Sequence, residues 1–338
     1  MTLTSNVVPV GCAPTRTGGH RTDGYGHAAA LQDELDDDLS AAGRAPSPWL
    51  APRSRFATMT ETTTGRNSGP ITGYAAGVPF TALPPAGGAD VPAPLVVTWH
   101  MMDAPRSDSA FAAALPLTDV PAWRVHLGMP LVGRRSVEGA YEAALADPVL
   151  RYVDPVVRQA TEEFLPALDA LEDELPLSGG PIGIVGASLG GTVALNVVAR
   201  VPVQVSAVAL VNPAIRARTV VDIFTAAAGT SYEWDERAHA AADHLDFVAH
   251  AGLISGRRPA PAVLVVSGEL DYPISRADAG ELVAALQAEY QDPARVRLST
   301  IAGLDHPLAE QPGIEPAPQI PLAKVVDCVV SEWFRANL

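Results

Sequence analysis

The chain has 338 residues, 48% of them hydrophobic, which is enough for a sizeable buried core. No apolar run approaches the roughly 20 residues that a membrane span needs, so we expect a cytoplasmic protein without membrane contacts. The 23 Lys and Arg residues are outnumbered by 38 Asp and Glu residues, giving a formal charge of −15 that disfavours nucleic acid as a partner.

The N-terminal segment, residues 1–69, differs in composition from the rest of the chain. It is rich in Thr, Ser, Gly, Arg and Asp, and it carries an acidic run at residues 33–38. Such a segment buries too little apolar surface to offset the entropy of ordering it, so we predict a mostly disordered extension. Met59 opens a stretch that reads like an ordinary N-terminus. The first 58 residues are therefore either a dispensable extension or the result of a start site set too early.

From residue 70 onward, apolar runs of strand length alternate with longer amphipathic stretches. Strands are predicted at residues 95–99, 123–127, 182–185, 205–211, 263–266 and 296–301. Helices are predicted at residues 109–115, 154–175, 189–199, 277–290 and 322–335. Continuous apolar strands are typical of a sheet that is covered on both faces. We therefore predict one α/β domain over residues 70–338, with a doubly wound, mostly parallel sheet and helices on both faces.

A glycine-rich turn separates the predicted strand at 182–185 from the helix that follows it. Residues 186–191 read Gly-Ala-Ser-Leu-Gly-Gly, with Ser188 in the turn itself. A serine nucleophile needs a sharp strand-to-helix turn that exposes its hydroxyl, and small residues two positions before and after it avoid collisions. The helix N-terminus also offers unpaired N–H groups to a developing oxyanion. Ser188 is therefore the candidate nucleophile.

His306 is the candidate base. Serine is a weak nucleophile near neutral pH, so a neighbouring group must take its proton. Among the histidines that follow Ser188, His306 alone lies in a loop directly after a predicted strand and just before the terminal helix. That position places it at the carboxyl edge of the sheet, where ligands bind in open α/β folds.

The acid that orients the base is expected after a strand between Ser188 and His306. Residues 263–273 read Val-Leu-Val-Val-Ser-Gly-Glu-Leu-Asp-Tyr-Pro, which places Asp271 in the turn after such a strand. A carboxylate there would fix the tautomer of the imidazole and stabilise the imidazolium. Glu269, two residues earlier, is the alternative acid.

The order Ser, Asp, His along the chain, together with the turn around Ser188, resembles the α/β-hydrolase superfamily. Residues 268–271 resemble the acid turn of that family, and residues 303–306 resemble its histidine loop. The resemblance covers about residues 70–338 and is specific for fold and catalytic machinery rather than for substrate.

The resemblance also implies an oxyanion hole made of two backbone N–H groups. The first belongs to Leu189, the residue after the nucleophile. Family members often carry His-Gly after the third strand, and the residue after that Gly gives the second N–H. Here residues 99–103 read Trp-His-Met-Met-Asp, so Met102 is the expected donor by analogy and Met101 is the alternative. His100 is expected to be a structural hydrogen-bonding residue.

The interval 214–260, between the sixth and seventh strands of the family fold, is predicted to form a small helical lid. It includes an amphipathic stretch at residues 236–253 and four aromatic residues: Phe224, Tyr232, Trp234 and Phe247. Such a lining would suit a modest, partly apolar acyl or alcohol group, although core packing is an equal alternative for Phe247. Arg106, just beyond the oxyanion loop, is either a surface arginine or a contact for a substrate carboxylate.

These features favour a serine hydrolase that cleaves a carboxylic ester, or a thioester or amide, through an acyl-enzyme intermediate. Acyl transfer with the same three residues is one alternative, and a non-catalytic binding protein of the same fold is another. The complete set of Ser, Asp and His weighs against the binding protein. The expected partner is a small-molecule acyl substrate. No metal-type spacing of ligands and no dinucleotide-binding glycine pattern is visible, so no cofactor or metal is predicted.

Overall fold

The computed structural model describes residues 69–338. The extension predicted for residues 1–69 therefore lies outside the described residues, except for residue 69. The described residues form an eight-stranded sheet with the order β1-β2-β4-β3-β5-β6-β7-β8. The strands are β1 (Ile71–Ala75), β2 (Val78–Leu83), β3 (Leu95–Trp99), β4 (Trp123–Leu127), β5 (Ile182–Ala187), β6 (Val205–Val211), β7 (Ala262–Gly268) and β8 (Val296–Ile301). Only the pairs β1–β2 and β2–β4 are antiparallel. The predicted α/β fold with a mostly parallel sheet is confirmed.

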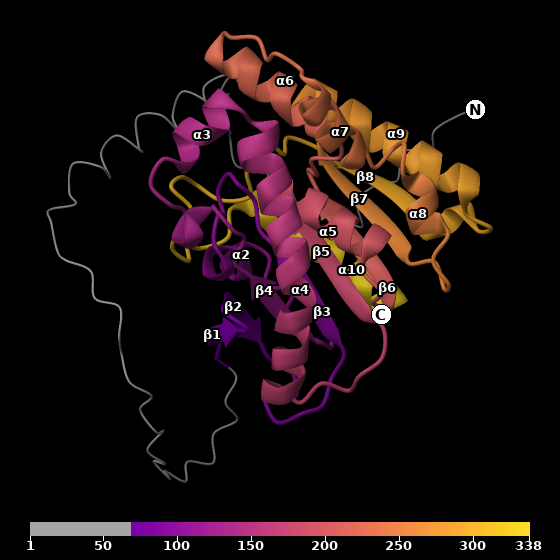
Figure 1. The fold of residues 1–338 in the computed structure, drawn as a ribbon. Coiled ribbons are helices and arrows are strands. Elements are labelled where there is room, and N and C mark those ends of the chain that lie inside the picture. The colour runs from indigo at the N-terminus through magenta and orange to yellow at the C-terminus, as the bar shows by residue number, and fades with distance from the viewer. Residues whose placement is uncertain (1–68) are drawn as a thin grey trace, which may run out of the picture.

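Helices cover both faces of this sheet. α2 and α10 pack on one face, and α4, α5 and α9 pack on the other. Figure 1 shows α4 in front of the strands and α10 behind them. The helices are α2 (Asp108–Ala114), α3 (Ala140–Ala146), α4 (Asp154–Glu174), α5 (Leu189–Arg200), α6 (Ala217–Ala228), α7 (Glu236–His244), α8 (Ala251–Ser255), α9 (Pro273–Glu289) and α10 (Pro321–Asn337). Shorter turns are η2 (Gly133–Arg135), the π-helix η3 (Val149–Val153) and η4 (Pro293–Arg295).

Alternate residues of the central strands belong to two separate cores. On β3, Leu95, Val97 and Trp99 pack into the core on the side of α4, while Val96 packs into the core on the side of α10. None of these four side chains is more than 3% exposed. Because both faces are buried, the strand has no solvent-facing side that would require polar residues. This is the physical reason for the long apolar runs in the sequence.

The hairpin of β1 and β2 is not predicted by the sequence. Its two-residue turn has Ala76 at φ 49° and Gly77 at φ 88°. Positive φ at both central residues matches the twist of the strands, and Asn-Gly or Asp-Gly is the usual sequence for such a turn. Ala-Gly is a weak signal, because alanine rarely adopts positive φ.

The interval between β6 and β7 holds α6, α7 and α8. The amphipathic stretch expected over residues 236–253 is interrupted between α7 and α8. There the Asp246 carboxylate accepts the N–H groups of Val248 over 3.1 Å and Ala249 over 3.0 Å. A side chain that satisfies backbone donors in this way supports a turn in place of a continuous helix.

Candidate active site

Ser188 lies in the sharp turn between β5 and α5. Its backbone adopts φ 49° and ψ −123°, a strained conformation for a residue other than glycine. Its N–H donates to the carbonyl of Val211 over 3.0 Å, and its carbonyl accepts the N–H groups of Gly191 and Ala214, each over 2.9 Å. These bonds fix the turn so that the Ser188 hydroxyl stands at the carboxyl edge of the sheet.

Two glycines allow this turn to pack against its surroundings. A Cβ atom on Gly186 would collide with the carbonyl of Gly190. A Cβ atom on Gly190 would collide with the carbonyl oxygens of Trp99 and His100 at the end of β3. Glycine at 186 therefore keeps the turn itself tight, and glycine at 190 lets the end of β3 pack directly against the turn that carries Ser188.

His306 contacts both Ser188 and Asp271. Its Nε2 atom lies 2.9 Å from Ser188 Oγ, and its Nδ1 atom lies 2.7 Å from Asp271 Oδ1. Because an ionised carboxylate can only accept, Nδ1–H donates to Asp271, and Nε2 is left to accept the hydroxyl proton of Ser188. The three residues are at most 9% exposed. This arrangement can move a proton from Ser188 to His306.

The rival carboxylate, Glu269, points away from the imidazole. Its Oε2 atom accepts the N–H of Gly303 over 2.9 Å, and its side chain is exposed. Of the two carboxylates considered from the sequence, Asp271 is thus the one that contacts His306.

Asn212 joins the loops that carry the acid and the base. Its Nδ2 atom donates to the backbone carbonyls of Asp305 and His306, each over 2.9 Å. Its Oδ1 atom accepts the N–H of Gly268 over 2.7 Å, at the end of β7. Asn212 is 1% exposed and has φ 42°, a backbone region in which asparagine is enriched. One buried side chain therefore fixes the spacing between the turn of Asp271 and the loop of His306.

The loop after β3 is held in place by His100. Its Nδ1–H donates to the carbonyl of Met101 over 2.7 Å, and its Nε2 accepts the N–H of Met129 over 2.9 Å. Burial lowers the pKa of His100 to about 4, so the imidazole is neutral and can donate at one nitrogen while accepting at the other. His100 has the structural role expected of it.

The two methionines of this loop differ in their surroundings. The N–H of Met101 donates to the carbonyl of Pro105 over 3.3 Å, and the Met101 side chain is fully buried. Met102 lines the cavity that also exposes Ser188. Of the two methionines, Met102 is therefore the one that lines the cavity beside Ser188.

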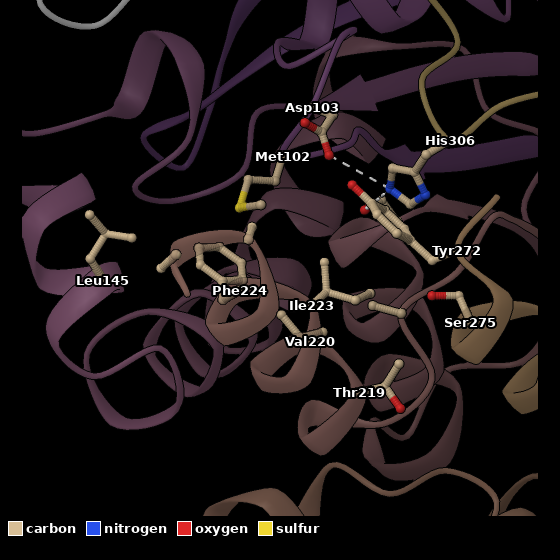
Figure 2. Close-up of a pocket in the computed structure, with 14 residues that line it drawn as sticks. Met102, Asp103, Leu145, Thr219, Val220, Ile223, Phe224, Tyr272, Ser275 and His306 are labelled. Carbon is tan, nitrogen blue, oxygen red and sulfur yellow. Dashed lines mark hydrogen bonds and ion pairs between the residues drawn. The ribbon is translucent and has the colours of Figure 1, made fainter. Parts of the chain in front are cut away.

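A cavity of about 330 Å³ opens beside Ser188 and His306 (Figure 2). One stripe of α6 forms much of its wall, with residues at i, i+1, i+4, i+5, i+8 and i+9: Thr219, Val220, Ile223, Phe224, Ala227 and Ala228. The rest of the lining is Met102, Asp103, Leu145, Ala214, Tyr272 and Ser275. In Figure 2, Leu145 and Phe224 lie at the end of the cavity away from His306. Mostly apolar walls with polar groups near one end are typical of a small-molecule site.

Three carboxylates act on the charge of His306. Burial alone would lower the pKa of His306, because the imidazolium is poorly solvated inside the protein. Together, the carboxylates of Asp271, Asp103 and Asp305 outweigh this effect and raise the pKa of His306 to about 9. Asp103 acts from the opposite side of the ring, with its Oδ2 atom 3.7 Å from Nε2. The imidazolium that would form on proton transfer is therefore stabilised at both nitrogens.

The family model described as "Putative esterase" matches residues 125–313, more than half of the chain. The chain belongs to this esterase family. It is an enzyme of the α/β-hydrolase superfamily, as the resemblance implied, and its family indicates that it hydrolyses esters. No curated protein matches the esterase closely enough to count as a relative.

Solved structures share the fold of the esterase at low sequence identity. TT1662 from Thermus thermophilus is 19% identical with a TM-score of 0.54, over 79% of this chain and 99% of that one. Carboxyl esterase 2 from the fungus Tuber melanosporum is 16% identical with a TM-score of 0.51, over 91% and 98% of the two chains. A puromycin-hydrolysing peptidase from Mycobacterium tuberculosis is 16% identical with a TM-score of 0.56, over 82% of this chain and 40% of that one.

The esterase brings together three of the site residues expected from its sequence, and the two expected oxyanion donors lie on neighbouring segments. Ser188, His306 and Asp271 form one hydrogen-bonded chain. Leu189 is the first residue of α5, and Met102 lies on the cavity wall. All five residues follow the carboxyl ends of parallel strands, where ligands bind in open α/β folds.

Sequence reasoning missed Asp103 and Asn212. Asp103 directly follows Met102, but whether its side chain faces the cavity depends on the conformation of the loop. Asn212 follows β6 immediately, and the asparagine itself is the one local signal in the sequence, because this residue type tolerates the positive φ that the structure shows. Neither residue belongs to a motif with a known spacing.

The aromatic residues expected around the pocket have different roles. Phe224 lines the cavity, whereas Phe247 is fully buried in the core, the alternative considered for it. Tyr232 and Trp234 lie outside this cavity and pack edge to face, with ring centroids 4.9 Å apart. Arg106 also lies outside the cavity lining, so it makes no wall for a substrate carboxylate.

Two kinds of feature are missing from the esterase within residues 69–338. No group of three or more His, Cys, Asp or Glu side chains in that range is arranged to hold a metal ion. None of the helices in that range combines the length and the apolar character that a bilayer span requires.

Proposed function

We propose that the protein is a serine carboxylic-ester hydrolase that works through an acyl-enzyme intermediate. The observation that carries the proposal is the continuous hydrogen-bonded chain from Ser188 Oγ through His306 to Asp271 Oδ1. Ser188 is the nucleophile, His306 is the general base and acid, and Asp271 holds the imidazole in the tautomer that can accept a proton at Nε2.

Acylation begins when Ser188 Oγ attacks the acyl carbon and its proton passes to His306 Nε2. The carbonyl π electrons move onto oxygen, and the N–H groups of Leu189 and Met102 stabilise this oxyanion. The tetrahedral intermediate then breaks the bond to the leaving oxygen. That oxygen takes the proton from Nε2 and departs as an alcohol, which leaves Ser188 acylated and His306 neutral.

Deacylation repeats these steps with water as the nucleophile. His306 Nε2 takes a proton from the water as its oxygen attacks the acyl carbon, and the same two N–H groups receive the new oxyanion. The bond to Ser188 Oγ breaks, Oγ recovers the proton from Nε2, and the carboxylic acid is released. These steps use only groups of the protein, the ester and water.

The shape of the cavity supports a small acyl substrate with an apolar body. Its volume of about 330 Å³ lies at the lower end of the range for small-molecule sites, and α6 supplies mainly Ala, Val, Ile and Phe to its wall. We assign residues 214–260 as the lid, because α6 from that interval forms the wall beside Ser188. A cytoplasmic location stays a prediction, to be checked by cell fractionation.

Fluorophosphonate labelling, combined with a panel of p-nitrophenyl esters of increasing chain length, tests the proposal. We expect labelling and turnover in the wild type and neither in Ser188→Ala, since loss of the nucleophile removes several orders of magnitude in rate. Thermal unfolding of both proteins serves as the control that the variant is folded. Retention of more than a few per cent of activity by Ser188→Ala would mean that another residue is the nucleophile. Product analysis with added alcohol separates hydrolysis from acyl transfer.

A further inference from the structure

Asp103 places a carboxylate beside the reacting atoms. Its side chain is 14% exposed and lines the cavity that contains Ser188 and His306. Oδ2 lies 3.7 Å from His306 Nε2, the same nitrogen that contacts Ser188 Oγ over 2.9 Å. In Figure 2, Asp103 lies beside Met102, and a dashed line joins its carboxylate to His306.

Asp103 has few polar neighbours in the cavity. Within residues 69–338, no hydrogen bond reaches its carboxylate, and His306 is the one cationic side chain in ion-pair range. The negative charge of Asp103 also acts on two tyrosines. Burial together with this charge raises the pKa of Tyr272 and of Tyr152, so both phenols stay neutral. When His306 is neutral, as it must be to accept the proton of Ser188, the Asp103 carboxylate faces no cationic side chain among the described residues, so it can attract a cation on the substrate.

We propose that Asp103 binds a cationic group on the leaving-group side of the substrate, so that the preferred substrates are esters of amino alcohols. This inference rests on the proposed function, because it takes His306 Nε2 as the proton donor to the leaving oxygen. The apolar walls of the cavity do not distinguish a charged leaving group from a neutral one, and Asp103 supplies that distinction.

The geometry assigns the cation to the leaving group. For proton transfer the leaving oxygen must lie within about 3 Å of His306 Nε2. An ammonium hydrogen-bonded to a carboxylate lies about 2.8 Å from it. Since Asp103 Oδ2 is 3.7 Å from Nε2, an amine two carbons from the leaving oxygen can reach the carboxylate while the oxygen stays at Nε2.

A pair of substrates of nearly equal shape tests the inference. In 2-(dimethylamino)ethyl butyrate the leaving alcohol carries a protonated amine, and in 3-methylbutyl butyrate a CH group takes the place of that nitrogen. We expect the ratio of kcat/KM for the cationic ester to that for the neutral ester to be about 10 to 100 in the wild type, the range for one hydrogen bond between charged groups. In Asp103→Asn, which keeps the shape and removes the charge, the ratio should fall to near 1.

Glu142→Gln is the matched control. Glu142 is an exposed carboxylate on α3, the helix that also carries Leu145 of the cavity wall, and it does not line the cavity. Its removal changes net charge by the same amount as Asp103→Asn. The ratio should stay at the wild-type value in Glu142→Gln, which separates local binding from general attraction of cations to an acidic protein.

A second substrate pair places the amine on the acyl side: ethyl 4-(dimethylamino)butanoate and ethyl 5-methylhexanoate. We expect no preference that depends on Asp103 in this pair. A cation preference found only here, or one that survives in Asp103→Asn, would overturn the assignment, and so would equal rates for the two butyrates. If the wild type hydrolyses none of the four esters and resists fluorophosphonate, the proposed function itself is wrong, which is a different outcome from loss of selectivity alone.

Discussion

The side-chain amide of Asn212 donates a hydrogen bond of 2.9 Å to the backbone carbonyl of His306. The same side chain accepts the N–H of Gly268, at the start of the turn that carries Asp271. The distance between the base and its orienting acid is thus set by a residue that touches neither imidazole nor carboxylate. Asn212 is a positioning residue.

Asn212→Asp should reduce kcat by roughly 10², the effect of displacing a reacting group by about 1 Å, with little change in KM. An aspartate keeps the acceptor for Gly268 but sets a carboxylate oxygen against two carbonyl oxygens, which pushes the His306 loop away. Asn212→Ala should also lose about 1–3 kcal/mol of unfolding free energy, because it leaves the buried N–H of Gly268 without an acceptor. Steady-state kinetics and thermal unfolding measure both effects. A fall in stability without a fall in kcat would contradict the positioning role.

Asp271→Asn should reduce kcat by roughly 10⁴, because an amide favours the wrong tautomer of the imidazole. Glu269→Gln is the paired control and should retain nearly full activity, since its carboxylate bonds to the N–H of Gly303 and not to His306. Rates with a p-nitrophenyl ester decide between them. The reverse pattern would transfer the role of the acid to Glu269.

The value of kcat/KM for a neutral ester should rise with pH, reach half of its maximum near pH 9 and level off above that pH. Only the neutral imidazole can accept the proton of Ser188, and the nearby carboxylates raise the pKa of His306 to about 9, so the imidazolium predominates below that value. Asp103→Asn removes one of the charges that raise this pKa, so the rising limb should move to lower pH. A profile measured in both proteins, corrected for spontaneous hydrolysis, gives the comparison. An unchanged limb in Asp103→Asn would show that the Asp103 charge does not act on His306.

Met102→Pro should reduce kcat by roughly 10²–10³, the effect of losing one oxyanion donor. Met102→Leu should retain most of the activity, because only the backbone N–H is required. Met101→Pro removes the N–H that bonds to Pro105, which is a bond within the loop rather than a bond to substrate. If Met102→Pro matches Met102→Leu while Met101→Pro is inactive, the donor is Met101.

Local patterns in the sequence predict most of the sheet. β3, β4, β6 and β8 have the expected bounds. The fully buried β3 shows as a nearly unbroken apolar run, whereas the edge strand β8 carries exposed Arg297 and Thr300 between its buried residues. The contact of Ser188 with His306 also follows from chain order, since loops after parallel strands meet at one edge. By contrast, the direction of the Asp103 side chain and the core position of Phe247 depend on contacts between distant segments. No single stretch of sequence encodes those contacts.

Along α6, the cavity-lining residues from Thr219 to Ala228 extend over about 14 Å of helix at 1.5 Å per residue. The reacting side chains come from other segments, so the length of substrate group that fits can be altered by changing one helix face while the chemistry stays intact. A larger residue at Ala228 would shorten the space at the far end, and a smaller one in place of Phe224 would lengthen it. The length of the substrate group that the enzyme accepts can therefore be engineered separately from its catalytic rate.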